Sequence, residues 1–217
     1  VEKAKFWENL GADEITLSFV DINRNFRILK KIREKVRCQI KLIANLDCLY
    51  HCPILTYHAN SIAHASQLTH QMHNFLVDYY YLSCDYKRIA EPEQFIRSGW
   101  IRPEDVRYYE DIGIDKIKLL DRRMTTEQIS LIVEAYTKRK YDGNLLDLFP
   151  HTTKTIVHKR GSTFHKLKYF FHPFLVNVFK LAKGRKLFTE RKVFIDNRKL
   201  DGFLEYFLKE DCDLKSC

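Results

Sequence analysis

The chain has 217 residues, of which 45% are hydrophobic and 30% are charged, so it can bury a core and does not have the composition of a disordered protein. Its length suggests one or two domains. It contains no run of about 18 apolar residues, and its first residues do not have the pattern of a signal peptide. We therefore expect no membrane-spanning helix and a cytoplasmic location.

The net charge of +9 is concentrated at the C-terminal end. Residues 151–217 hold 15 Lys and Arg against 7 Asp and Glu, whereas residues 1–150 hold 22 against 21. This division predicts two segments, a nearly neutral segment over residues 1–150 and a basic, Phe-rich C-terminal extension over residues 151–217. The sequence begins with Val1 inside an amphipathic pattern, and we expect it to be a fragment of a longer chain.

Four short apolar runs, each leading into a helical pattern, dominate residues 1–150. They cover residues 13–20, 39–45, 76–83 and 114–120. After the first run, Asn23 or Asn25 can cap a helix that continues to about Val36. After the second, Pro53 suits the first position of a helix that continues to about Phe75.

Four further segments also carry helix or turn signals. In "WIRPEDVRYYEDIG", Pro103 is expected to begin a helix and Gly113 to end it. Thr125 and Gln128 form a capping-box pattern, which predicts a helix to about residue 140. In "YDGN", Gly143 is expected to take a positive φ within a turn. A short amphipathic helix is predicted near the C-terminus, with one apolar face formed by Leu200, Phe203, Leu204, Phe207 and Leu208.

This alternation of strands and helices predicts parallel strands joined by crossover helices, and hence the α/β class. Two architectures fit about four such units. One is a doubly wound open sheet, and the other is a partial, half TIM-like β/α barrel. Four units cannot close a barrel, so the second architecture requires further units before Val1.

Polar and sulfur-containing side chains follow the predicted strands, where parallel sheets gather their chemistry. Asp47 and Cys48 come after the second run, and Cys84 comes after the third. If these two strands are neighbours, Cys48 and Cys84 can approach one point, because adjacent strands lie about 4.8 Å apart. Cys52 shares the loop of Cys48, so three thiols are predicted to converge. Asp121 and Arg122 follow the fourth run.

These thiols leave three alternatives open. An iron–sulfur cluster needs about four thiolates, which Cys48, Cys52 and Cys84 would supply together with Cys212 or Cys217. Zinc could use the same thiols, with Cys212, His51 or His58 as the fourth ligand. The cysteines could also be ordinary structural residues, as is expected for Cys38 at the start of a strand.

Other residues suggest further chemistry. His58 lies near a strand end and could serve as the base for a Cys48 nucleophile in proteolysis, although no serine elbow motif occurs. Arg122 could hold an anionic substrate, oriented by Asp121. A structural salt bridge to Glu104, Asp105 or Asp121 is the alternative for Arg102 and Arg122, and it is the expectation for Arg123. Between residues 154 and 192, eleven Lys and Arg alternate with aromatic residues, which suits RNA binding or an apolar strap with solvated lysines.

Four stretches together resemble the collagenase-like peptidase family U-32: "GADEITLSFVDINRNF", "IANLDCLYHCPILTYHANSIAH", "WIRPEDVRYYEDIGIDKIKLLDR" and "AYTKRKYDGNLLDLF". The resemblance implies the C-terminal half of a TIM-like barrel. It also implies a four-iron–four-sulfur (4Fe-4S) cluster on four cysteines, used in some members to hydroxylate RNA bases or quinone precursors. The better-known cysteine signature of the family is replaced here by "NLDCLYHCP".

These considerations give one leading hypothesis and two alternatives. The leading hypothesis is an iron–sulfur-binding barrel that acts in hydroxylation-type modification or maturation of RNA or a small-molecule precursor. The first alternative is proteolysis, with a protein as the substrate. The second is a non-catalytic scaffold that binds RNA or a partner subunit.

Overall fold

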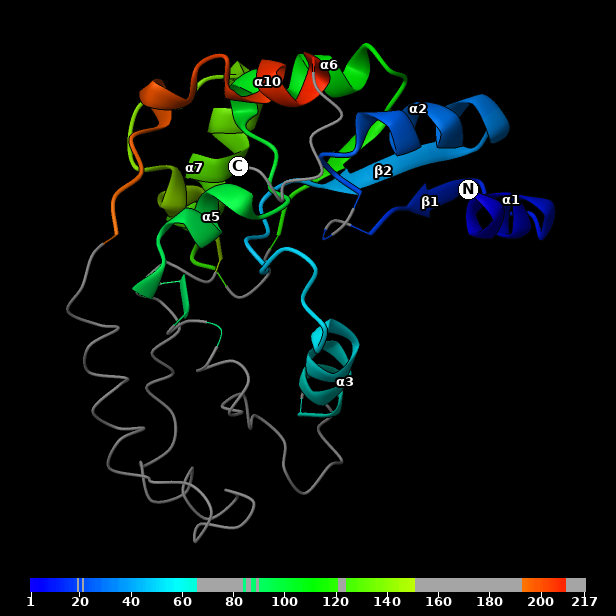
Figure 1. Cartoon of the computed structure of the whole chain (residues 1–217), viewed down its shortest axis with the longest axis horizontal. Helices are drawn as coiled ribbons and strands as arrows, with labels where there is room; N and C mark the ends of the chain where they lie inside the picture. Colours follow the sequence, from blue (N-terminus) through cyan, green and yellow to red (C-terminus); the bar gives the residue numbers. More distant parts are fainter. Residues whose placement is uncertain are drawn as a thin grey trace, which may run out of the picture. The chain divides into compact units, whose positions relative to one another are not determined.

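The computed structural model describes residues 1–65 except 19 and 21, residues 84, 87 and 88, and residues 90–120, 124–150 and 193–209. The chain divides into two compact units (Figure 1). The first unit comprises residues 1–51, 97–153 and 194–217, and the second comprises residues 52–96 and 154–193. The boundary expected near residue 150 is not tested, because residues 151–192 lie outside the described part.

A parallel three-stranded sheet forms the centre of the first unit. Its strands are β1 (Glu14–Thr16), β2 (Gln39–Ile43) and β3 (Lys116–Lys118), in the order β1-β2-β3. Ile15 is paired with Ile40, and Leu42 with Ile117, so these apolar side chains share one face. The α/β class and the strands predicted from the first, second and fourth apolar runs are confirmed.

The apolar face of the sheet packs against helices of the same unit. Helix α2 (Phe26–Lys35) contributes Leu29 and Ile32, and α6 (Val106–Glu110) contributes Tyr109. Figure 1 shows α2 running alongside β2. The helix start falls where the sequence places it, since Asn25 caps α2 by accepting a hydrogen bond from the backbone N–H of Ile28 at 3.0 Å.

Two further helix signals are confirmed. A 3₁₀ turn at Pro103–Asp105 leads into α6, and Gly113 follows α6 with a φ of 83°. Helix α7 (Thr126–Lys138) begins with the predicted capping box: Thr125 accepts a hydrogen bond from the backbone N–H of Gln128, whose side chain in turn accepts one from the N–H of Thr125.

The remaining described elements are short. They are α1 (Glu2–Asn9), α3 (Leu55–Ala65), α5 (Glu93–Arg97), a 3₁₀ turn at Leu145–Leu148, a second at Asn197–Leu200, and α10 (Phe203–Lys209). Helix α3 starts two residues after Pro53, and its predicted continuation to Phe75 lies outside the described residues. Helix α10 confirms a helix near the C-terminus, with Leu204 buried in the core of the first unit. Its expected apolar face is not formed as predicted, because Leu200 lies in the preceding 3₁₀ turn and Leu208 is 38% exposed.

The convergence of Cys48 and Cys84 assumed that the second and third predicted strands are neighbours, and Gly143 was expected to have a positive φ. Strand β2 pairs with β1 on one edge and with β3 on the other, so its described residues leave no edge for the run at 76–83, which itself lies outside the described residues. Gly143 does not take a positive φ. It is a glycine for another reason: a Cβ there would lie 3.0 Å from the hydroxyl of Tyr141.

A closed or half-closed barrel is not shown by this sheet. In a sequential β/α barrel each strand pairs with the strands immediately before and after it in the chain. Here β1 and β3 are the edge strands of the described sheet. In the part of the chain that the structure describes, no helix is both long and apolar enough to cross a membrane.

Candidate functional site at the carboxyl edge of the sheet

Buried asparagines organise the carboxyl edge of the sheet. Asn23, which follows β1, donates from Nδ2 to the carbonyl oxygens of Ile43 and Gly99, both at 2.7 Å. Its side chain is fully buried, so these bonds replace water for two backbone carbonyls that would otherwise lack a donor. The sequence suggested Asn23 only as a possible helix cap, and this tie between β1 and β2 was missed.

Asn45 makes the equivalent tie between β2 and β3. Its Oδ1 accepts a hydrogen bond from the backbone N–H of Leu120 at 2.7 Å, and its Nδ2 donates to the carbonyls of Leu120 and Leu148. Asn45 is also fully buried. The loop after β2 is therefore held rigidly where it begins.

The loop from Asp47 to Cys52 starts from this fixed point. Asp47 is fully buried, and its backbone carbonyl accepts a hydrogen bond from the hydroxyl of Ser98 at 3.0 Å. The backbone N–H of Ile101 donates to the carbonyl of Ala44 at 2.8 Å, so residues 98–101 run beside the end of β2. Asp47 thus follows the end of β2, as the sequence predicted, but its side chain is enclosed by protein.

The two thiols of this loop flank a strained turn. Cys48 and Cys52 are both half-buried. Between them, His51 takes a φ of 49°, in the left-handed region that costs a non-glycine residue about 1–3 kcal/mol. The exposed His51 ring lies 3.9 Å from the ring of Tyr50, measured between centroids. Backbone strain of this kind is typical of segments whose geometry serves a purpose other than stability.

Cys84 has a distinct environment in the second unit. The guanidinium of Arg88, one helical turn later, donates from Nη2 to its Sγ at 3.1 Å. Arg88 is buried and lies 5.9 Å from the ring centre of Phe95. A buried cation beside a sulfur favours the thiolate over the thiol. The sequence identified Cys84 but missed Arg88, for which the i, i+4 spacing was the available signal.

The other predicted site residues divide into two groups. His58 lies half-buried in α3. Asp121, Arg122, Cys212 and Cys217 lie outside the described residues, as does most of the basic extension. Among the residues that are described, no three Cys, His, Asp or Glu side chains lie close enough together to hold a metal ion.

Cys38 is separated from Cys48 by β2 itself. It precedes the strand, whereas Cys48 follows it, and the five residues of β2 span about 16 Å. Its backbone N–H donates to the carboxylate of Glu8 at 2.6 Å. Burial, and then the charge of Glu8, raise the pKa of the Cys38 thiol. The structural role expected for Cys38 therefore agrees with its position at the amino edge.

The "WIRPED" stretch forms a buried ion cluster rather than an open site. Arg102, only 2% exposed, pairs with Glu104 at 3.0 Å, with Asp105 at 3.9 Å and with Asp201. Glu104 also accepts hydrogen bonds from the backbone N–H of Tyr141 and from Nδ2 of Asn197. Arg102 thus takes the structural salt bridge that the sequence left open for it, and the cluster fastens the segment before α10 to the core.

A second buried arginine lies close to this cluster. The guanidinium of Arg24 is 4.3 Å from the ring centre of Trp100 and 5.2 Å from that of Phe203. The two rings are stacked, with their centroids 6.0 Å apart. Cation–π contacts of this kind are strengthened by burial, so Arg24 helps to fix α10 on the first unit. This arrangement was not anticipated from the sequence.

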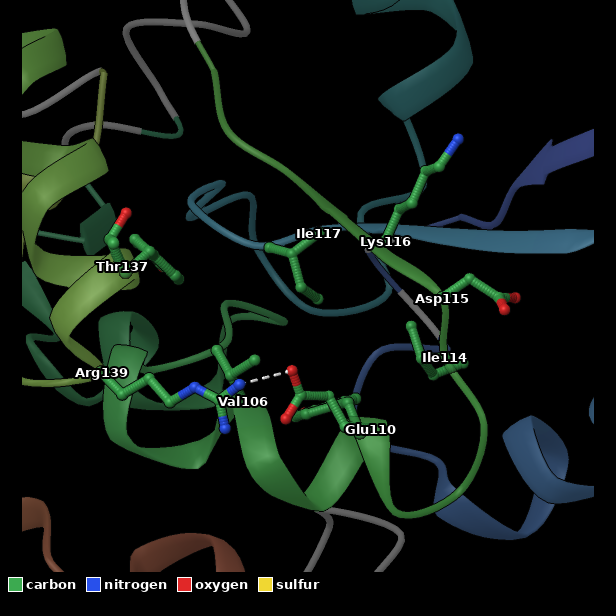
Figure 2. A pocket seen from close by; sticks show the side chains of 10 residues that line it. Val106, Glu110, Ile114, Asp115, Lys116, Ile117, Thr137 and Arg139 are labelled. Atoms are coloured by element: carbon green, nitrogen blue, oxygen red, sulfur yellow. Dashed lines mark hydrogen bonds and ion pairs between the residues drawn. The ribbon is translucent and has the colours of Figure 1, made fainter.

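A cleft of about 270 Å³ lies at the opposite end of the sheet, between α6, the start of β3 and the end of α7 (Figure 2). An ion pair between Arg139 and Glu110, 2.8 Å long, spans its wall. None of the predicted site residues lines it. Because the amino edge of a parallel sheet generally serves stability, the carboxyl edge remains the better candidate for chemistry.

The first unit is therefore a parallel α/β structure whose carboxyl edge carries a cysteine-containing loop that Asn45 holds where it begins. The chain is 34% identical over 207 residues to "Uncharacterized protease MJ1657" of Methanocaldococcus jannaschii, a match that covers 95% of this chain and 51% of the relative. The chain thus spans about half the length of that relative. The similarity to a protein named as a protease is consistent with the resemblance to U-32-type proteases. No protein-family model matches the chain, and no solved structure matches it.

Proposed function

We propose that this chain performs thiolate chemistry, with Cys48, Cys52 and Cys84 as ligands of an iron–sulfur cluster in a U-32-like protein. The observation that carries the proposal is the hydrogen bond from the buried Arg88 guanidinium to Cys84 Sγ. Such bonds stabilise the thiolate form that a cluster requires and tune the cluster that it binds. The biological role that follows is hydroxylation-type modification of RNA or a small-molecule precursor.

The described residues fit this cofactor in part. Cys48 and Cys52 are half-buried on one loop, which suits a sheltered cluster. The described thiols do not form a set of three close ligands in this structure, so the proposal requires Cys84 to approach the loop of Cys48 and Cys52 when the cluster binds, with Cys212 or Cys217 as the fourth ligand. A bound cluster would supply electron transfer, and Arg88 would supply a fixed positive charge beside one ligand.

Anaerobic reconstitution with iron and sulfide tests the cluster. We expect the visible absorbance of an iron–sulfur cluster, together with bound iron and acid-labile sulfide. Separate Ser substitutions at Cys48, Cys52 and Cys84 should each remove most of the signal. Cys38→Ser is the matched control, because Cys38 lies at the other edge of β2, and it should leave the signal unchanged. Equal loss in all four variants, or no cluster in the wild type, would reject the proposal.

Proteolysis is the second candidate, and the name of the relative favours it. Cys48 would attack the peptide carbonyl and His58 would accept the thiol proton. The test is cleavage of an unstructured protein such as casein by the metal-free chain, with Cys48→Ala and His58→Ala as variants. Cleavage that both substitutions abolish, and that Cys38→Ala leaves intact, would establish this function in place of the first.

The state of Cys84 can be measured independently of either activity. Alkylation by iodoacetamide follows the thiolate fraction, so its rate rises through the pKa of the thiol. Arg88→Met removes the neighbouring charge and should move this rise to higher pH, whereas Arg88→Lys should move it less. If the profile of Cys84 is the same in all three proteins, Arg88 does not stabilise a thiolate.

A further inference from the structure

The cleft at the amino end of the sheet has one cation and one carboxylate at its wall (Figure 2). Glu110 ends α6 and Arg139 directly follows α7, and an ion pair of 2.8 Å joins Oε1 of the first to Nη2 of the second. The two side chains are 46% and 51% exposed, and in the part of the chain that the structure describes neither makes a further ion pair. An exposed ion pair adds little to stability, so a ligand that satisfies both charges can separate it at small cost.

The other charged residues that line the cleft are directed elsewhere. Lys116 points away from the cleft in Figure 2, and its ammonium pairs with Glu14 at 2.8 Å. The carboxylate of Asp115 accepts hydrogen bonds from Arg33 at 3.0 Å and from a backbone N–H of β2 at 2.8 Å. The ion pair at the wall therefore supplies the charges that the cleft offers to a ligand, and it supplies one of each sign.

The rest of the lining is largely apolar. Val106, Tyr109 and Ile114 are almost fully buried, and Ile117 points into the cleft from β3 (Figure 2). The cleft volume of about 270 Å³ lies just below the range of about 300–1,000 Å³ that is typical of pockets for drug-sized ligands. The space therefore suits an apolar group of a few carbon atoms.

The backbone of Arg139 gives an independent reason to look for a ligand. Its φ of 52° and ψ of 37° lie in the left-handed region. Glycine is the usual residue in this conformation at the end of a helix, because it adopts the conformation without a steric penalty. An arginine here lowers stability, and the exposed ion pair with Glu110 offsets little of that loss. Binding would give the guanidinium a use that stability does not.

We propose that this cleft binds an α-amino acid with an apolar side chain. The ion pair opens, the guanidinium of Arg139 donates two hydrogen bonds to the ligand carboxylate, and the ligand ammonium donates to the carboxylate of Glu110. The apolar side chain of the ligand covers Ile114 and Ile117. One charge of each sign matches a zwitterion, whereas a phosphate is repelled by Glu110 and a polyamine by Arg139. The cleft lies at the amino edge of the sheet, so its ligand does not depend on the thiolate chemistry proposed above.

Isothermal titration calorimetry of the 217-residue chain with L-leucine tests this site. Two truncated probes each remove one charge: 4-methylpentanoate lacks the ammonium, and 3-methylbutylamine lacks the carboxylate. Each should bind at least about tenfold more weakly than leucine, because a charge-assisted hydrogen bond is lost. L-alanine keeps both charges but lacks three carbon atoms of the side chain, and it should also bind at least about tenfold more weakly.

Substitutions locate the ligand in the cleft. Arg139→Gly should weaken leucine binding by at least about tenfold without lowering the thermal unfolding midpoint, because glycine suits the left-handed backbone. Glu110→Gln should weaken the binding of leucine but not that of 4-methylpentanoate. Thr137→Trp fills the cleft from its α7 side and should block leucine. Lys138→Ala is the matched control: it removes an exposed ion pair with Glu134 on the same helix, outside the cleft, and should leave leucine affinity unchanged.

Several results would overturn the proposal. They are the absence of saturable leucine binding, equal affinities for leucine and 4-methylpentanoate, tighter binding of inorganic phosphate than of leucine, and wild-type leucine affinity in Arg139→Gly or Thr137→Trp. If Arg139→Gly does not fold, Glu110→Gln and Thr137→Trp still decide, because each changes an exposed side chain of the cleft and leaves that backbone position intact.

Discussion

Asp105 gives the sharpest test of the buried ion cluster. Its carboxyl is 7% exposed and lies 3.9 Å from the guanidinium of Arg102. Burial raises the pKa of Asp105 from 3.8 to about 6, with Glu104 acting in the same direction and Arg102, Arg24 and Arg107 acting against it. The native structure therefore holds this carboxyl in a site that favours its protonated form.

The direction of the pH effect follows from this shift. The folded chain binds the Asp105 proton more tightly than the unfolded chain, whose pKa is near 3.8. The stability that this proton binding adds to the folded chain is complete below the pKa of Asp105 in the unfolded chain. It is lost as pH rises through the folded-state pKa of about 6. A difference of about two pKa units corresponds to about 3 kcal/mol at most, at about 1.4 kcal/mol per unit.

Asp105→Asn removes this titration while keeping the shape of the side chain. As pH rises from about 4 to about 8, the free energy of unfolding of wild type should fall relative to that of the variant by up to about 3 kcal/mol. Urea denaturation followed by Trp fluorescence measures both proteins across this range. Asp111→Asn, at an exposed carboxylate after the same helix, is the control and should track wild type. A constant difference between Asp105→Asn and wild type across the range would refute the reasoning.

Three further substitutions test the supports of the site by the same unfolding measurement. Asn23→Ala should cost about 2–4 kcal/mol, because two buried carbonyls lose their donor, and a cost below about 0.5 kcal/mol would contradict this role. Gly113→Ala should cost at least about 1 kcal/mol, since φ is 83° and a Cβ would lie 2.8 Å from Cδ of Arg33; an unchanged stability would show that the turn relaxes freely. Thr125→Ala should cost about 1 kcal/mol through loss of the cap on α7, with Thr126→Ala as a neighbouring control.

Local signals in the sequence were reliable where one residue decides the backbone. Asn25 and Thr125 each satisfy backbone N–H groups at a helix start, and Gly113 follows its helix with a positive φ, as predicted. These features depend on residues within one turn of each other, so a single sequence carries all the information. Gly143 is the exception, because its need for a small side chain comes from the ring of Tyr141 rather than from φ.

Strand pairing and the buried polar ties were not predictable in the same way. Apolar runs identify strands, but nothing in them specifies that β2 pairs with β3 across 72 intervening residues, 44–115. In the sequence, Asn23 and Asn45 resemble ordinary loop residues, because the groups to which they hydrogen-bond lie far away along the chain. The prediction that three thiols converge assumed that the second and third predicted strands are neighbours in the sheet. The observed order β1-β2-β3 removes that support, but it does not place Cys48 and Cys84 relative to each other.

The two ends of the sheet differ in how their polar groups are used. At the amino edge, Glu8 accepts hydrogen bonds from the backbone N–H groups of Arg37 and Cys38, and Arg33 pairs with Asp115 at 3.0 Å. Each of these groups secures a strand or helix end. At the carboxyl edge, the buried side chains of Asn23 and Asn45 do that work. A change at Asn45 should therefore weaken the edge of the sheet itself, and the loop that carries Cys48 begins beyond these ties. That separation is the physical reason to look for function in the loop after β2.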